Sequence, residues 1–393
     1  MSVPSLSNEE ELHWLALRLV PGLGFRKAGQ LIERYRGPQA VFRASVSELE
    51  GAGVAQVTVL PALSNVPSSV ARSIASGCTF EDAAGQKEKM QEHGAAAIPI
   101  TDARYPRRLR EIFDPPLLLF ARGRIELLAS LSVAIVGTRR PTPYGMAVAE
   151  RLASDLGRAG LTITSGLARG IDTAAHRGAL GVEAGTIAVF GCGVDVVYPA
   201  ENRRLAAQIA AKGLLISEFP MGSPAYPQNF PVRNRVVSGV SAGVVVVEGA
   251  QYSGSSITAR LALDQGREVF AVPGNITSKA SWGPNLLIKQ GAKLVQDWND
   301  VVVELPAEDR RRLGEAGRGQ PDEPRQQELP LGPMNEVAKA VLEQLRVDRA
   351  TQIDNLLEAI ENFSSSEIIA ALFELEMLGV VRQLPGRNFV KVW

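Results

Sequence analysis

The sequence is poor in the residues that disulfide frameworks and metal sites require. Only 2 cysteines and 3 histidines occur among its 393 residues, and Cys78 and Cys192 lie far apart. This scarcity excludes a disulfide scaffold and a cysteine-based zinc site, so we expect a reducing compartment and no metal. Acidic residues 9–11 stand where a signal peptide would be basic and then apolar, and no apolar run approaches the length of a membrane span. We therefore expect a cytoplasmic protein with no membrane partner.

The chain also lacks an excess of charge of either sign. Its 42 Lys and Arg residues balance 42 Asp and Glu residues, so the formal net charge at pH 7 is zero. A protein without a global basic field can bind nucleic acid only through a local basic patch. The length exceeds that of one ordinary domain, and two or three domains are expected.

The most informative pattern in the sequence lies at residues 133–159. The apolar run Val133–Val136 stops at Gly137 and gives way to basic and turn-forming residues, after which apolar residues of 146–159 recur at helical spacing. This pattern predicts a buried strand, a loop and a helix. The backbone N–H groups of such a loop and of the helix N-terminus attract an anion, most often a phosphate. Arg139 and Arg140 are placed to add charge and forked hydrogen bonds.

Three further motifs, at residues 165–172, 230–241 and 253–258, are interpreted in the same way. We interpret them, with the first, as four loops that follow four strands. Loops at the carboxyl ends of parallel strands share one edge of a sheet, so the four motifs should converge on one site. The expected contact residues are Gly137, Thr138, Arg139, Arg140, Ser165, Gly166, Arg169, Phe230, Arg233, Asn234, Arg235, Ser253, Gly254 and Ser255.

A dinucleotide cofactor is disfavoured. Its fingerprint needs three glycines in the pattern G-x-G-x-x-G and an acidic residue at the end of the second strand. The second predicted strand ends in Thr164, Ser165 and Gly166, and the nearest glycine pattern, at 191–193, has Val196 in place of its third glycine. We therefore expect no cofactor.

The motifs 136–140, 165–172, 230–235, 253–260 and 269–274, in this order, closely resemble the DNA-processing protein A family, also called Smf. The resemblance extends from about Ile100 to Val302. It implies a non-enzymatic protein that protects incoming single-stranded DNA and helps load the RecA recombinase during natural transformation. It also favours base stacking over core packing for Phe230. The chain departs from the family in having Thr138 where many members carry serine, and in having no basic residue at 226–229.

The expected fold class is α/β, with an extended Rossmann-like, mostly parallel sheet over residues 84–305. Residues 1–83 read as a helical domain, either a helix-hairpin-helix that contacts DNA or a sterile-alpha-motif-like bundle that contacts protein. Residues 306–333 are charged and rich in Gly, Pro and Gln, which predicts a flexible linker. Residues 334–393 predict a winged helix whose third helix is acidic, so we expect it to contact protein.

Two other classes of function stay open, along with the oligomeric state. The sheet also resembles the lysine-decarboxylase-like nucleotide phosphoribohydrolases, but the loop 251–256 lacks their Pro-Gly-Gly-x-Gly-Thr pattern. A pure assembly scaffold is the second alternative. Consecutive Leu286, Leu287 and Ile288 offer more apolar surface than one packed face absorbs, which together with the resemblance predicts a homodimer.

Overall fold

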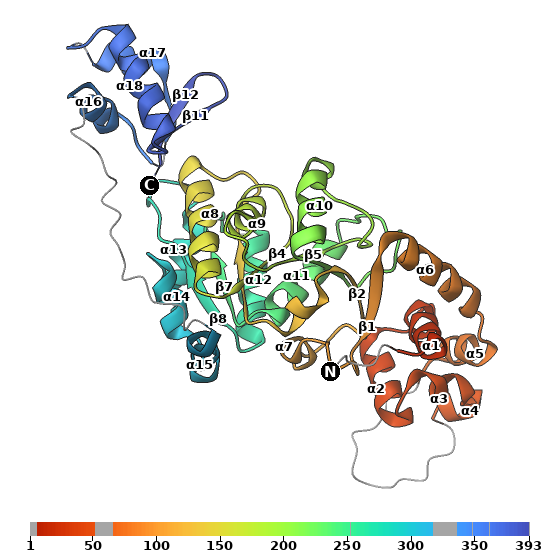
Figure 1. The fold of residues 1–393 in the computed structure, drawn as a ribbon. Coiled ribbons are helices and arrows are strands. Elements are labelled where there is room, and N and C mark those ends of the chain that lie inside the picture. The colour runs from red at the N-terminus through yellow and green to blue at the C-terminus, as the bar shows by residue number, and fades with distance from the viewer. Residues whose placement is uncertain are drawn as a thin grey trace.

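The computed structural model describes residues 6–51, 66–251, 253–316, 336–347, 349–360 and 362–392. It contains a helical N-terminal part, a central sheet with helices on both faces, and a small C-terminal domain (Figure 1). The N-terminal helices are α1 (Asn8–Leu19), α2 (Phe25–Tyr35), α3 (Pro38–Arg43), α4 (Val46–Leu49), α5 (Ser68–Ser76) and α6 (Phe80–His93). The predicted helical hairpin is α1 and α2, joined by a turn in which Gly22 has a φ of 75°.

Nine strands of the described residues form one sheet in the order β1-β2-β6-β5-β4-β3-β7-β8-β9. They are β1 (Ala95–Pro99), β2 (Leu118–Gly123), β3 (Ser132–Val136), β4 (Thr162–Ser165), β5 (Thr186–Phe190), β6 (Leu214–Ser217), β7 (Gly243–Val246), β8 (Glu268–Ala271) and β9 (Lys293–Leu294). Only β2 runs against its neighbours among these strands. The mostly parallel, Rossmann-like sheet is therefore confirmed. The strand order reverses between β3 and β7, and ligands of such sheets bind at this switch point.

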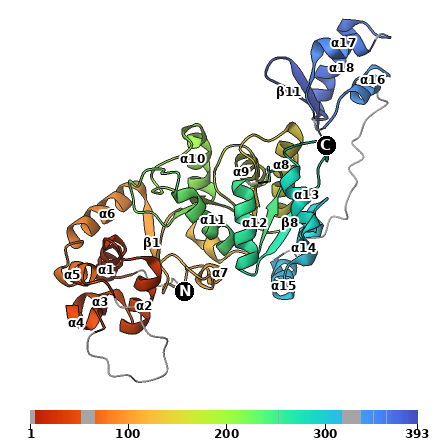
Figure 2. The same cartoon turned by 180° about the vertical axis from the view of Figure 1, so that it is seen from behind.

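Helices cover both faces of the sheet (Figure 2). The helices α8 (Pro143–Arg158), α9 (Ile171–Gly181) and α14 (Trp298–Glu304) pack on one face, where the side chains of Val133, Ile135 and Val245 are fully buried. The helices α11 (Asn229–Val240) and α12 (Gly254–Asp264) pack on the other. The remaining elements of this region are α7 (Arg107–Arg110), η1 (Ile125–Ala129), η2 (Ala200–Asn202), α10 (Arg203–Lys212) and α13 (Trp282–Lys289).

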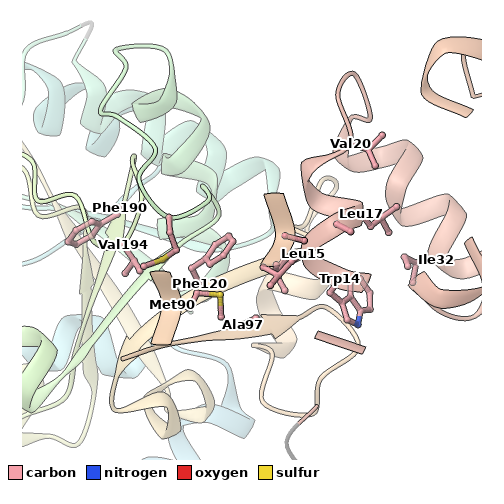
Figure 3. Close-up of a cluster of buried hydrophobic side chains, with 14 of the residues drawn as sticks. Trp14, Leu15, Leu17, Val20, Ile32, Met90, Ala97, Phe120, Phe190 and Val194 are labelled. Atoms are coloured by element: carbon pink, nitrogen blue, oxygen red, sulfur yellow. The ribbon is translucent and has the colours of Figure 1, made fainter. Parts of the chain in front are cut away.

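The N-terminal helices share a hydrophobic core with the sheet. Trp14 and Leu17 of α1 belong to the same buried cluster as Phe120 of β2 and Phe190 of β5 (Figure 3). The predicted domain boundary at residue 83 falls inside α6 and needs correction. Phe80, at the start of this helix, stacks on Phe42 of α3, while Met90 near its end is buried in the shared cluster. The two parts are joined by a continuous helix and a continuous core.

The predicted linker over 306–333 is wrong for its first part, since α15 (Ala307–Ala316) is a helix. Asp309 is buried and forms an ion pair with Arg108, and Leu313 packs on the core of the sheet. Residues 317–333 lie outside the described part of the chain. The composition of residues 306–333 could not predict this helix, because the burial of the Asp309 carboxylate depends on Arg108, some 200 positions away in the chain.

The predicted winged helix is confirmed. Its elements are α16 (Glu336–Gln344), β10 (Thr351–Gln352), α17 (Ile353–Ala359), α18 (Ser365–Met377), β11 (Val381–Leu384) and β12 (Asn388–Lys391). The Ser364 hydroxyl and the Glu367 carboxylate form a capping box that starts α18. This helix presents Ile369 and Phe373 to solvent, and no Lys or Arg lies on it.

Candidate functional site

The loop after β3 is fixed to the end of β7 at the switch point. The Thr138 amide donates to the carbonyl oxygen of Glu248 at 2.7 Å. The Thr142 amide and hydroxyl donate to the two oxygens of the Glu248 carboxylate at 2.9 Å and 2.5 Å. The Thr142 hydroxyl also accepts from the Gly145 amide and so caps α8. A side-chain carboxylate of the protein therefore lies at the start of the helix where a phosphate was expected.

The glycines of this loop serve close packing. A Cβ on Gly137 would come within 2.6 Å of the Ile171 side chain and 2.9 Å of the Glu248 carbonyl oxygen. A Cβ on Gly145 would overlap the Glu248 carboxylate. These two glycines let the ends of neighbouring strands and helices approach one another.

Backbone amides of the loop after β4 likewise donate hydrogen bonds to a carboxylate of the protein itself. The Asp172 carboxylate accepts from the amides of Gly166 and Ala168 at 3.1 Å and 3.3 Å. Burial raises the pKa of Asp172, although the nearby Arg233 guanidinium opposes this shift. Burial also raises the pKa of Glu248, against the hydrogen bonds from Thr142. Because the amides of Thr142, Gly166 and Ala168 already donate to these carboxylates, we expect side chains to supply much of the contact with a phosphate at this edge.

Arg139 and Arg140 have side chains that could hold a phosphate at this edge. Both are exposed, and within the described residues neither guanidinium forms an ion pair. The Arg139 guanidinium lies 5.8 Å from the ring centroid of Phe230, within the range of a cation–π contact. The neighbouring Arg169 is exposed as well, but it forms an ion pair with Glu201 at 2.6 Å.

Phe230 is half-buried at the start of α11. Its ring packs on Gly191 and lies 5.4 Å from the ring of Tyr198, with the two planes tilted by 39°. Tyr198 is 47% exposed, so the pair has one face toward the core and one toward solvent. The sequence analysis missed Tyr198. The signal available was an aromatic residue before a proline in the loop after β5.

The structure corrects the prediction for 230–241, which is helix α11 and not a loop. Arg233 and Arg235 are 4% and 5% exposed, so neither is an exposed phosphate contact. Arg233 donates to the carbonyl oxygens of Gly166 and Val189 and ties α11 to the ends of β4 and β5. Arg235 pairs with Glu218 at 2.8 Å and with Asp114 at 2.9 Å. Both arginines position the helix that carries Phe230.

The other expected contact residues differ in exposure. Ser165 is fully buried and donates to the carbonyl oxygen of Ile135. Ser253 caps α12 by accepting from the Ser256 amide, and its hydroxyl shares a hydrogen bond of 2.7 Å with the buried Ser255. The residues with at least partial exposure at this edge are Gly137, Thr138, Arg139, Arg140, Gly166, Arg169, Phe230, Asn234, Ser253 and Gly254.

The fold and the site together define a Rossmann-like protein whose switch point presents arginines beside an aromatic pair. The chain belongs to the family described as DNA recombination-mediator protein A, whose model matches residues 96–306. A second model, described as the DprA winged helix domain, matches residues 321–387. The resemblance found in the sequence is confirmed, and with it a role in DNA processing.

Relatives and a solved structure agree with this assignment. The chain is 32% identical over 411 residues to "Protein Smf" of Synechocystis sp., a match that covers 98% of this chain and 99% of the relative. It is 41% identical over 290 residues to "Protein Smf" of Escherichia coli, covering 74% and 75%. The crystal structure of DNA processing protein A from Streptococcus pneumoniae superposes with a TM-score of 0.59 at 33% identity, covering 77% of this chain and 99% of that one.

No helix in the described ranges has the length and apolar character needed to cross a membrane. The described side chains include no group of three or more His, Cys, Asp or Glu that could hold a metal ion.

Proposed function

We propose that this chain is a non-enzymatic recombination mediator that binds single-stranded DNA along the carboxyl edge of its sheet. The observation that carries the proposal is the exposed pair Arg139 and Arg140 beside the aromatic pair Phe230 and Tyr198. Basic side chains that follow the phosphate backbone, with aromatic faces on which bases stack, are the general means of binding single strands. The zero net charge makes such a local patch necessary.

A nucleotide-processing enzyme is the alternative, and the site offers it little support. The carboxylates nearest the switch point, Glu248 and Asp172, are buried and accept hydrogen bonds from the loops themselves. A general acid or base must be able to reach its substrate. Binding of a single strand by the arginine and aromatic side chains requires no general acid or base.

The finer biological role follows from family membership. We propose that the protein acts in the cytoplasm during natural transformation, where it protects incoming single strands and helps load RecA. We also propose a homodimer through α13 and its surroundings. Leu286, Leu287 and Ile288 are half-buried there, and Trp282 and Leu294 are 42% and 44% exposed. Two subunits joined by this patch would engage one strand with greater avidity.

The test of the proposed function is a gel shift with oligo-dT run beside a nucleotide-hydrolysis assay on the same preparation. We expect a salt-sensitive shift and no hydrolysis. Hydrolysis without a shift would favour the enzyme. A preparation with neither property would leave the assembly scaffold as the better account.

A further inference from the structure

A cavity lies where the N-terminal helices meet the sheet. Its volume is about 230 Å³, and it is lined by Phe25 and Arg26 of α2 and by Phe113, Asp114 and Pro115 of the segment that leads into β2. Phe113 is 79% exposed, and the Arg26 guanidinium lies 4.6 Å from its ring centroid. An aromatic ring held in the open at the mouth of an apolar cavity is unusual for a side chain with only a packing role.

The sheet register places this cavity on the same edge as the switch-point loops. Phe120 of β2 pairs with Ser217, the last residue of β6, and Leu118 continues beyond that end. The segment 113–117 therefore lies at the carboxyl edge of the parallel strands. Four strand spacings separate β3 from β2 along the sheet of the described residues, which is about 20 Å at about 4.8 Å each.

The charges around the cavity favour a polyanion. Asp114, the carboxylate in its lining, pairs with the buried Arg235 at 2.9 Å; Arg235 also pairs with Glu218 at 2.8 Å, and Arg18 near Glu218 supplies the second positive charge. Arg26 lies at the ring of Phe113, and Arg107 on the adjacent α7 has a side chain that is 78% exposed. Arg107 shares its charge with Glu111 in an exposed pair, which is a weak interaction.

A rigid connection joins this cavity to the switch-point site. The ring centroid of Phe25 lies 5.0 Å from the guanidinium of the half-buried Arg18 and 5.4 Å from that of the buried Arg235. Arg235 belongs to α11, the helix that begins beside Phe230. The two aromatic sites are thus connected through Phe25, Arg235 and α11.

We propose that Phe113 and this cavity form a second stacking site for a base of the same single-stranded DNA, with Arg26 at the adjoining phosphate. The inference rests on the proposed function and deepens it, because it extends the DNA path from the switch point to the N-terminal helices. Stacking on an aromatic ring accepts any base, so this site adds affinity without sequence preference.

The experiment compares a short oligo-dT of about 4 nucleotides with a long one of about 16, spanning the site sizes of single-strand-binding folds. Binding to the full chain is measured by fluorescence anisotropy for wild type, Phe113→Ala and Phe113→Trp. The control is Phe373→Ala, which removes a phenylalanine that is 67% exposed on the winged helix. Melting temperatures verify that each variant is folded.

We expect Phe113→Ala to weaken binding of the long oligonucleotide by about 5- to 150-fold and to leave the short one unchanged. Phe113→Trp should keep wild-type affinity, and the long strand should quench its added indole fluorescence. Wild-type affinity of Phe113→Ala for the long strand overturns the second site alone, and so does an equal loss with Phe373→Ala. A wild-type protein that binds neither oligonucleotide overturns the proposed function and this inference together.

Discussion

At the scale of single residues, the Glu248 carboxylate lies at the start of α8, in the position where the sequence predicted a phosphate. It accepts hydrogen bonds from the Thr142 amide and hydroxyl at the start of α8, where the helix dipole favours negative charge. The protein thereby satisfies part of its own helix terminus, and in the proposed complex the phosphate contacts would fall to the exposed side chains of Arg139 and Arg140. Such contacts tolerate the irregular path of a single strand better than fixed amides do.

Glu248→Ala should remove the carboxylate from the start of α8. We expect the free energy of unfolding to fall by about 1–3 kcal/mol, because the Thr142 amide loses its partner in a partly buried place. Inorganic phosphate should then raise the melting temperature of the variant more than that of wild type, since a free helix N-terminus binds anions. An equal phosphate response in the two proteins would show that the terminus is not an anion site even when empty.

His176 is a second buried group with a measurable consequence. Its Nδ1 lies 2.8 Å from the Thr186 hydroxyl, which donates its own proton to the Ile163 carbonyl oxygen, so Nδ1 carries the hydrogen. Burial and then the nearby Arg233 lower the pKa of His176 from 6.5 to about 3. Between these values the unfolded chain takes up a proton that the folded chain does not.

The stability that neutral His176 contributes is therefore present above about pH 6.5 and is lost as the pH falls. We expect wild type to lose up to about 1.4 kcal/mol per pH unit more than His176→Gln between pH 6 and pH 4. Urea unfolding at several pH values measures both. Parallel pH profiles would mean that His176 has an ordinary pKa.

At the scale of elements, α11 is the part that the sequence could least predict. The motif 230–241 was interpreted as one of four loops that follow strands, and its Pro231 is compatible with a helix because proline is well tolerated in the first turn. The burial of Arg233 and Arg235 was hidden because their partners lie far away in the chain, up to 121 positions for Asp114. By contrast, the strand β3 was recognisable because Val133–Val136 is an uninterrupted apolar run that ends at Gly137.

The role of α11 in presenting Phe230 is tested by two substitutions. Phe230→Leu keeps much of the apolar contact with Gly191 but removes the aromatic face. We expect it to weaken single-strand binding by about 1–3 kcal/mol with little change in thermal stability. Phe230→Ala should lose a similar amount of binding and some stability as well, because the ring is half-buried. If Phe230→Leu binds oligo-dT like wild type, the ring is a packing residue only.

At the scale of the whole molecule, the shared core makes the N-terminal helices and the sheet one unit. The sequence predicted the order of the parts, and the composition changes sharply after Glu304. It could not predict that α6 would cross the expected boundary at residue 83 or that α15 would form within the expected linker, since their anchoring residues, Met90 and Asp309, contact side chains from distant segments.

The proposed dimer belongs to this scale. A wild-type protein at tens of micromolar, roughly where weak dimers form, should scatter light with twice the mass of the chain. Ile288→Glu should return it to a monomer, because a charge would be buried in an apolar interface. Ile369→Glu, on the exposed face of α18, is the matched control and should stay dimeric. A monomeric wild type rules out the dimer, and a dimeric Ile288→Glu places the interface elsewhere.

The most direct test of the account is the salt dependence of oligo-dT binding by wild type, Arg139→Ala and Arg158→Ala. Both substitutions remove an exposed arginine, one in the switch-point loop and one in the last turn of α8, where Arg158 pairs with Asp155. If Arg139 contacts a phosphate, its loss should flatten the plot of log affinity against log salt by about 0.7 and cost about 1.5–3 kcal/mol. Arg158→Ala should keep the wild-type slope and affinity. A folded Arg139→Ala protein with the wild-type slope and affinity would contradict the proposal that this edge holds the DNA backbone.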